Sequence, residues 1–249
     1  MTYSVILPTL NEKGHIIELI KKIRDIFTKN NLVFEIIIVD DNSSDGTIAI
    51  VENFIKNNSF VRLHVRKDKR SLPDSLNDGI NLSYHKKIIW MDADFQHPPE
   101  YIQDFINLSD KSDAIICSRF LEKSNRYFNI NKLDKDINEN QSLFFNTLCK
   151  NFIFNDITDF TSGYICVNKN VLKNYHLHGF YGDYFLNFIL HLKQNKFTII
   201  EIPFSDNKRK TGLSKTVVKL NYEYIYTCFR YLLTFLKVLT KIIFVKIKF

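Results

Sequence analysis

Short apolar runs alternate with longer amphipathic stretches along most of the chain. The runs are four or five residues long and rich in Ile and Val, which is typical of buried strands; they cover 4–7, 35–39, 61–65, 87–91, 114–117 and 198–202. Stretches with helical periodicity lie between them, at about 12–29, 45–56, 73–83, 98–107, 141–153 and 181–193. This alternation predicts an α/β fold whose mainly parallel sheet is flanked by helices.

Residues 120–140 interrupt the pattern. They are polar and rich in Asn, Lys and Asp, and they predict a long mobile loop.

The 249 residues suffice for one α/β core with a small appendage. No basic segment followed by a long apolar one opens the chain, so we expect a cytoplasmic protein. Four scattered cysteines without a C-x-x-C pair predict reduced, packed thiols.

Positive charge is concentrated at the C-terminus. Residues 205–249 hold ten Lys or Arg against two acidic residues, whereas the remaining residues are close to neutral within a net charge of +7. A basic tail on a nearly neutral body indicates an anionic partner at that end, either nucleic acid or a membrane surface.

The tail has a helical pattern that favours the membrane. At about 100° per residue, one narrow stripe holds Lys219, Glu223, Arg230, Lys237, Lys241 and Lys248. Bulky aliphatic residues fill the rest, which disfavours a nucleic-acid binder. The longest uncharged run, Tyr231–Leu236, is far below the roughly 20 residues that span a bilayer. We therefore expect 217–249 to lie in the plane of the membrane interface. A helix packed on the protein body is the alternative, and it would not require the row of cations.

Two carboxylates, Asp40 and Asp41, follow the strand 35–39. The residues after them, up to Thr47, are typical of a turn and a helix N-terminus. That interpretation leaves the repulsion and desolvation of two adjacent carboxylates unexplained. An acidic side chain at a strand end can accept hydrogen bonds from the base or ribose of a nucleotide, as in dinucleotide-binding folds.

A second acidic motif follows the strand 87–91. Asp92 and Asp94 can converge on one hard cation there, and Gln96 can add a third oxygen, a ligand set that suits Mg²⁺ or Mn²⁺. The ion would neutralise a nucleotide diphosphate as it leaves. A lone D-x-D is usually solvated surface, but its position at a strand end, before Gln and Pro-Pro, favours a functional site. His97 either joins this site or serves as a cap.

Near the C-terminus, Arg209 and Lys215 lie six residues apart across Thr211 and Gly212. Such a segment can act as a flexible phosphate clamp, in which Arg makes bidentate contacts and Lys supplies a point charge. A solvated basic loop is the alternative.

Together these motifs resemble the family-2 glycosyltransferases, and most of all the dolichol-phosphate mannose synthases and other polyprenyl-phosphate glycosyltransferases. The resemblance covers roughly 3–216 and rests on the order and spacing of P-T-L-N-E (8–12), D-D-N-S-S-D-G-T (40–47), M-D-A-D-F-Q-H-P-P (91–99), S-R-F (118–120), D-F-T-S-G-Y (159–164) and R-K-T-G-L-S-K (209–215). It implies a GT-A-type, Rossmann-like domain over 1–216, followed by amphipathic interface helices over 217–249.

The resemblance also implies the roles of individual residues. The donor site would be lined by Pro8, Leu10, Glu12, Val39, Asp41, Asp92, Ala93, Asp94, Gln96, Arg209 and Lys215. The metal ion, Mg²⁺ or Mn²⁺, would be held by Asp92, Asp94 and Gln96. Direct roles in catalysis would belong to Asp94, Arg119, Arg209 and Lys215, the three cations meeting phosphates.

The chain departs from the pattern of these synthases at several positions. Leu10 stands where they usually have Tyr, and Ile165 where they have Arg. Their acidic position in the helix 181–193 aligns with Asn187, although Asp183 lies one turn earlier on the same face. A second loop arginine has no clear match, and the candidates are Arg126, Lys132 and Lys135. These departures leave the donor chemistry intact and leave the sugar and the acceptor open.

The expected reaction is an inverting, metal-dependent transfer of a hexosyl group, of the mannose or glucose type. The donor would be a nucleotide diphosphate sugar, and the acceptor a dolichyl or undecaprenyl phosphate at the cytoplasmic face of a membrane. The acceptor phosphate is already ionised, so no general base is needed. One alternative is an enzyme that extends a surface polysaccharide or glycolipid, although the Q-x-x-R-W motif of processive synthases is absent. The other is a non-catalytic nucleotide-sugar-binding membrane protein, which the intact acidic and basic motifs disfavour.

Overall fold

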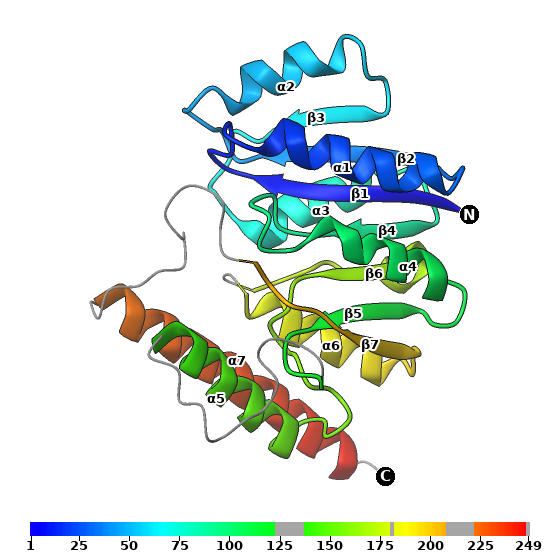
Figure 1. Cartoon of the computed structure of the whole chain (residues 1–249). Helices are drawn as coiled ribbons and strands as arrows, with labels where there is room; N and C mark the ends of the chain where they lie inside the picture. The colour runs from blue at the N-terminus through cyan, green and yellow to red at the C-terminus, as the bar shows by residue number, and fades with distance from the viewer. Residues whose placement is uncertain (123–136, 180–181, 208–221, 248–249) are drawn as a thin grey trace.

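The structure is a computed structural model that describes residues 1–122, 137–179, 182–207 and 222–247 (Figure 1). Arg209, Lys215 and the candidate loop cations Arg126, Lys132 and Lys135 lie outside these ranges, as does most of the segment expected to be a mobile loop.

A seven-stranded sheet in the order β3-β2-β1-β4-β6-β5-β7 forms the centre of the molecule. Its strands are β1 (Thr2–Thr9), β2 (Val33–Asp40), β3 (Val61–Val65), β4 (Lys87–Trp90), β5 (Ala114–Ser118), β6 (Ile165–Asn168) and β7 (Ile199–Pro203). Every ladder is parallel except the two that β6 forms with β4 and β5. The predicted strands are confirmed, and β6 is an additional strand that the sequence analysis missed.

The helices are α1 (Ile16–Lys29), α2 (Thr47–Ile55), α3 (Leu72–Leu82), α4 (Ile102–Leu108), α5 (Ile137–Phe152), α6 (Tyr184–Gln194) and α7 (Tyr222–Ile247), with two short 3₁₀ turns, η1 (Pro99–Tyr101) and η2 (Lys169–Leu172). The predicted helices are present with shifted ends. The first one begins at Ile16 instead of 12, because Glu12 and His15 form a turn closed by the carbonyl of Glu12. The helix α5 begins four residues earlier than expected.

Alternating strand residues separate the core into two layers. Ile6, Ile37 and Trp90 point to the face covered by α3, α6 and the inner sides of α5 and α7. Val5 and Ile38, which are adjacent in sequence to Ile6 and Ile37, point to the opposite face, which is covered by α1, α2 and α4 (Figure 1). Burial on both sides explains why the strands read as continuous apolar runs.

All strands except β6 run in one direction, so their carboxyl ends meet at a single edge, on the left of Figure 1. In open α/β sheets ligands bind outside that edge. The predicted motifs follow β1, β2, β4 and β5, and the fold therefore brings them together there.

The helix α7 packs on the body along one of its faces. Phe235 and Val238 are buried in the core, and the ring of Tyr231 makes an edge contact with Phe145 of α5 at 5.1 Å between centroids. The carboxylate of Asp183, at the start of α6, accepts a hydrogen bond of 2.9 Å from the hydroxyl of Thr234. The alternative expectation of a helix on the protein body thus holds for this face. No helix in the described ranges is long and apolar enough to cross a membrane.

Candidate functional site

The loops that follow β1 and β2 are joined by hydrogen bonds. The backbone N–H of Asn11 donates to the hydroxyl of Ser43 at 2.7 Å, and the side chain of Asn11 accepts from the N–H of Ser44 at 2.9 Å. Asn11 adopts a left-handed backbone with φ of 56°, which Asn tolerates better than most residues. The N–H of Glu12 donates to the hydroxyl of Thr47 at 2.9 Å. The P-T-L-N-E and D-D-N-S-S-D-G-T motifs therefore form one rigid unit.

The two adjacent aspartates have separate tasks. Asp40 is fully buried and accepts the N–H and hydroxyl of Ser43 at 2.6 and 2.7 Å. Burial raises the pKa of Asp40. The carboxylate of Asp41 instead pairs with the guanidinium of Arg66 and accepts the hydroxyl of Ser75 at 2.9 Å. Asp40 therefore fixes the loop, whereas Asp41 stays at the rim of the site.

Arg66 is a site residue that the sequence analysis missed. Its side chain is 4% exposed, and it bridges Asp41 to Asp78 of α3, which its Nε contacts at 2.8 Å. Burial acts to lower the pKa of Arg66, but the carboxylates of Asp41 and Asp78 raise it by a larger amount, so the net shift is upward. This cation offsets the desolvation of Asp41. The sequence feature that could have indicated this role is the position of Arg66 directly after β3, at a strand end like the other motifs.

Three apolar residues of the predicted donor site lie close to this unit. Pro8 and Val39 are paired in register across β1 and β2. The side chain of Val39 is fully buried in the core, so only its backbone can face a nucleotide. Leu10 is partly exposed at the end of β1.

The D-x-D motif forms a tight turn at the end of β4. The carboxylate of Asp94 is 2% exposed and accepts the backbone N–H of Gln96 at 2.9 Å. Between them Phe95 has φ of +66°, a left-handed conformation that is strained for a bulky side chain. Such strain persists where the surroundings impose it, often at functional sites. Ala93 is buried, whereas the side chain of Asp92 is 48% exposed.

His97 caps this turn. Its Nδ1 accepts the backbone N–H of Asp92 at 2.9 Å, and its ring stacks on Tyr164 at 4.9 Å between centroids. The ring is almost completely buried. These contacts agree with the capping and packing interpretation, and the position of Nε2 at 4.0 Å from a carboxylate oxygen of Asp92 agrees with the other one, in which His97 joins the site.

The side chains at this turn suit a divalent cation that arrives with a diphosphate. Among the described residues no three His, Cys, Asp or Glu side chains form a metal-binding group by themselves. The predicted set has two carboxylates and one amide oxygen instead. Mg²⁺ is commonly held by one or two carboxylates, with water and substrate phosphates completing the shell. Asp92, Asp94 and Gln96 therefore fit the ion without a fully protein-made cage.

Arg119, directly after β5, is clamped by Asp159. The Nε and Nη2 atoms of Arg119 donate to the two carboxylate oxygens of Asp159 at 2.8 Å each, and its backbone N–H donates at 3.1 Å. Nη2 also donates to the hydroxyl of Thr161 at 2.8 Å. Burial acts to raise the pKa of Asp159, but the guanidinium lowers it more, and the net shift is downward. Asp159 opens the D-F-T-S-G-Y motif, and the sequence alone predicted no role for it.

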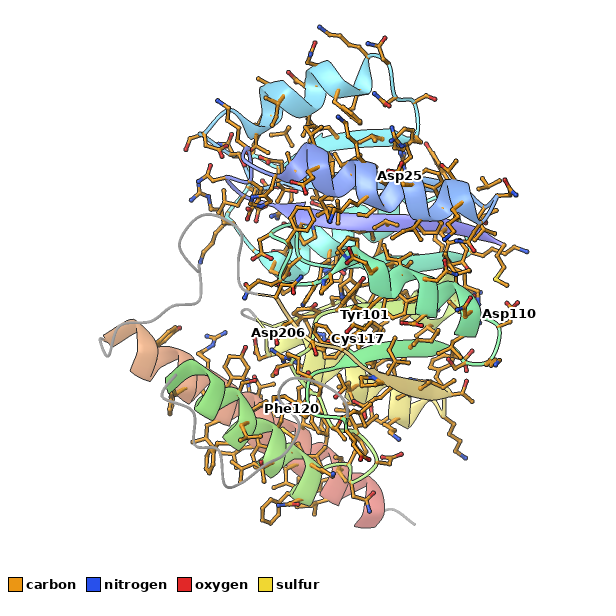
Figure 2. The ribbon with its side chains drawn as sticks, viewed as in Figure 1. Asp25, Tyr101, Asp110, Cys117, Phe120 and Asp206 are labelled. Atoms are coloured by element: carbon orange, nitrogen blue, oxygen red, sulfur yellow. The ribbon has the colours of Figure 1, made fainter. Side chains whose placement is uncertain are left out.

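The segment after β7 lies against the D-x-D turn. The backbone N–H of Asn207 donates to the carbonyl of Gln96 at 3.1 Å. Asp206 lies at the same edge of the sheet (Figure 2). Burial acts to lower the pKa of Arg119, but Asp159 raises it more, and the negative charge of Asp206 adds to this rise. Arg209 and Lys215 come two and eight residues after Asn207. Their predicted contacts with phosphates fall outside the described residues.

Comparison with known proteins gives one family. The model of glycosyl transferase family 2 matches residues 4–176. The dolichol-phosphate mannosyltransferase of Pyrococcus furiosus is 28% identical over 231 residues, which cover 92% of this chain and 63% of the relative. The chain thus spans less than two thirds of that protein. The dolichol-phosphate mannosyltransferase of Mycosarcoma maydis is 26% identical over 235 residues, 89% of this chain and 76% of the relative.

Solved structures share the fold at low identity. Glucosyl-3-phosphoglycerate synthase from Mycobacterium tuberculosis, in complex with Mn²⁺, UDP and phosphoglyceric acid, superposes with a TM-score of 0.67 at 15% identity, covering 96% of this chain and 78% of that one. Its complex with Mg²⁺ and UDP gives a TM-score of 0.66 at 15% identity, covering 96% and 79%. The expected GT-A-type architecture is confirmed.

Proposed function

The chain belongs to glycosyl transferase family 2, and from this premise we propose that it transfers a hexosyl group from a nucleotide diphosphate sugar to a polyprenyl phosphate. The sugar would be of the mannose or glucose type and the polyprenol dolichyl or undecaprenyl. Inversion at the anomeric carbon and a requirement for Mg²⁺ or Mn²⁺ are parts of the proposal. The observation that carries it is the convergence of Asp41, the Asp92–Gln96 turn and Arg119 at one edge of the sheet.

The donor half of the site would use the two acidic motifs. Asp41, held by Arg66, presents a carboxylate at the rim, where hydrogen-bond donors of a nucleoside can reach it. Asp92, Asp94 and Gln96 would hold the cation, which supplies charge neutralisation for the diphosphate. Arg209 and Lys215 would bind the same diphosphate, because the segment that carries them starts beside Gln96.

The acceptor half would use Arg119. Its guanidinium is oriented by Asp159, and an oriented, permanently charged guanidinium is a common partner of phosphate groups. An ionised phosphate monoester can attack the anomeric carbon without a general base, so the main task of the site is to position two phosphate groups. The names of the curated relatives support a polyprenyl phosphate as acceptor.

A panel assay tests the proposed reaction. The protein would be incubated with GDP-mannose, UDP-glucose and other nucleotide sugars, each with dolichyl or undecaprenyl phosphate and Mg²⁺ or Mn²⁺. We expect one donor to give a polyprenyl-phosphate hexose that is lost in excess chelator. Transfer only to a polysaccharide or glycolipid acceptor would contradict the proposal, and full activity in chelator would contradict the metal requirement.

We also propose that residues 217–249 hold the enzyme at the cytoplasmic face of a membrane through the outer face of α7. Opposite Phe235 and Val238, this helix exposes Phe229, Leu232, Leu236 and Ile243, each 45–55% accessible. These residues recur at a spacing of three, four and seven, so they form one stripe. Lys237 and Lys241 are exposed beside it. An apolar stripe next to cations suits an anionic lipid surface.

Vesicle co-sedimentation tests this surface. Replacing Leu232, Leu236 and Ile243 together by Ser should lower binding to anionic vesicles at least about tenfold, because it removes apolar area worth about 1 kcal/mol or more per residue. The control is Val33→Ser, an equally exposed apolar residue at the start of β2. Equal sedimentation of the triple variant, the control and the wild type would show that α7 does not bind lipid.

A further inference from the structure

Glu201, on the strand β7, has no role in the site described so far. Its carboxylate accepts three hydrogen bonds from the loop between α5 and β6: from the N–H of Thr158 at 2.8 Å, from the hydroxyl of Thr158 at 3.0 Å, and from the N–H of Asp159 at 3.1 Å. These two N–H groups belong to a loop and not to a sheet ladder, so a side chain has to satisfy them.

The contacts of Glu201 belong to a hydrogen-bond network that includes Arg119. The hydroxyl of Thr158 also bonds the hydroxyl of Ser118 at 2.6 Å, and Ser118 directly precedes Arg119 at the end of β5. Asp159, the second residue held by Glu201, is the residue that clamps the guanidinium of Arg119. Ser118, the last residue of β5, and Arg119 directly after it are thus tied to two consecutive residues of the loop. Glu201 holds that loop from the neighbouring strand β7.

We propose, on the basis of the function proposed above, that Glu201 is a positioning residue for Arg119, and that its ionised carboxylate holds the Thr158–Asp159 segment where Asp159 aims the guanidinium at a phosphate of the substrate. Both carboxylate oxygens of Glu201 act as acceptors, Oε2 toward Thr158 and Oε1 toward Asp159. Only the ionised form offers two acceptor oxygens without a donor in between. All of these hydrogen bonds can therefore form when the carboxylate of Glu201 is ionised.

Glu201 changes its charge close to neutral pH, because its surroundings raise the pKa of its carboxyl group. Burial raises the pKa of Glu201 to about 7, and the negative charge of Asp159 adds to the rise, against the hydrogen bonds that lower it. The charged group that acts on the pKa of Glu201 is Asp159, which is itself paired with Arg119. The pKa of Asp159 itself is lowered, so Asp159 remains ionised when Glu201 changes its charge.

The first test compares Glu201→Gln with the wild type over pH. The amide keeps one acceptor oxygen and turns the other position into a donor, so it imitates the protonated acid. We expect kcat/KM for the polyprenyl phosphate to be about tenfold lower than wild type at pH 8 and nearly equal at pH 6, since one charge-assisted hydrogen bond is lost only where the wild type is ionised. The acceptor phosphate titrates near pH 6 in both proteins and cancels in the ratio.

The matched control is Glu35→Gln. Glu35, on β2, is a buried carboxylate that also accepts three groups: the hydroxyl of Ser4, the N–H of Tyr84 and the guanidinium of Arg62. It lies toward the amino-terminal end of β2, away from the site. Its replacement should change thermal stability and leave the ratio of kcat/KM independent of pH. A ratio for Glu201→Gln that is also independent of pH would reduce Glu201 to a structural role and overturn the proposal.

A second measurement does not depend on activity. The Nε–H resonance of Arg119, assigned by its loss in Arg119→Lys, should shift in the wild type with a midpoint near pH 7, and this shift should vanish in Glu201→Gln, whereas shifts caused by histidines would remain. A resonance that does not move between pH 6 and 8 overturns the proposal. Should no polyprenyl phosphate accept sugar, the proposed function fails, and this titration still decides the role of Glu201.

Discussion

Replacing Asp94 with Asn should lower sugar transfer at least about a hundredfold, the largest effect expected of a single residue in the donor half. A divalent ion stabilises the developing charge of a leaving diphosphate by several kcal/mol, and each 1.4 kcal/mol corresponds to a factor of ten. Asn retains an oxygen that can accept the N–H of Gln96, so the turn itself should persist. Binding of Mn²⁺ in the presence of a nucleoside diphosphate, followed by electron paramagnetic resonance, should weaken in parallel.

Asp45→Asn is the matched control for this experiment. Asp45 forms the same kind of turn, because its carboxylate accepts the N–H two residues later, at Thr47, with the same distance of 2.9 Å. It lies in the loop after β2 and has no part in the proposed ligand set. Loss of a capping carboxylate costs about 1 kcal/mol of stability and should leave the binding of Mn²⁺ unchanged. Equal effects of both substitutions on metal binding would reduce Asp94 to a capping role.

The sequence carried enough information to predict the sheet because its parallel strands are buried on both faces. Ile36, Ile37 and Ile38 are all fully buried, and such runs contrast sharply with the amphipathic helices between them. The four residues of β6 gave no comparable signal, since a strand of that length after a turn motif has no periodicity to detect. Helix ends were displaced for a related reason: turns such as Glu12–His15 fit the helical pattern of the residues that follow.

The motifs lie together at one edge of the sheet because parallel strands share their carboxyl ends, and this placement was predictable from the sequence. The partners that hold them were not predicted, since these come from distant parts of the chain. Arg66 meets Asp41 from the end of a different strand, and Asp159 meets Arg119 across forty residues. Local spacing contains no information about such pairs. They become visible only when the topology of the sheet is known.

Replacing Asp159 with Asn should remove both stability and activity, and it is the largest structural effect that we expect. Asp159 is fully buried, and the side chain of Arg119 is 15% exposed. The amide would present a donor to a guanidinium that has only donors, which leaves a mostly buried charge without its anion. Breaking such a pair costs about 3–5 kcal/mol of unfolding free energy. Chemical denaturation at pH 7 measures this loss, and sugar transfer should fall with it because the guanidinium is no longer oriented.

The loss should shrink in acid, with a direction fixed by the ionisation of Asp159. Its pKa in the folded state is below the usual 3.8, so its stabilising contribution is fully present above that value and is lost as pH falls through the folded pKa. The difference in unfolding free energy between wild type and variant should therefore shrink steadily as the pH falls below 3.8. The control is Asp156→Asn in the same loop, whose pair with Lys193 is exposed and is worth at most about 1 kcal/mol. A difference between Asp159→Asn and wild type that is as small as that of the control, or that stays constant down to pH 2, would show that the carboxylate is not the clamp of Arg119.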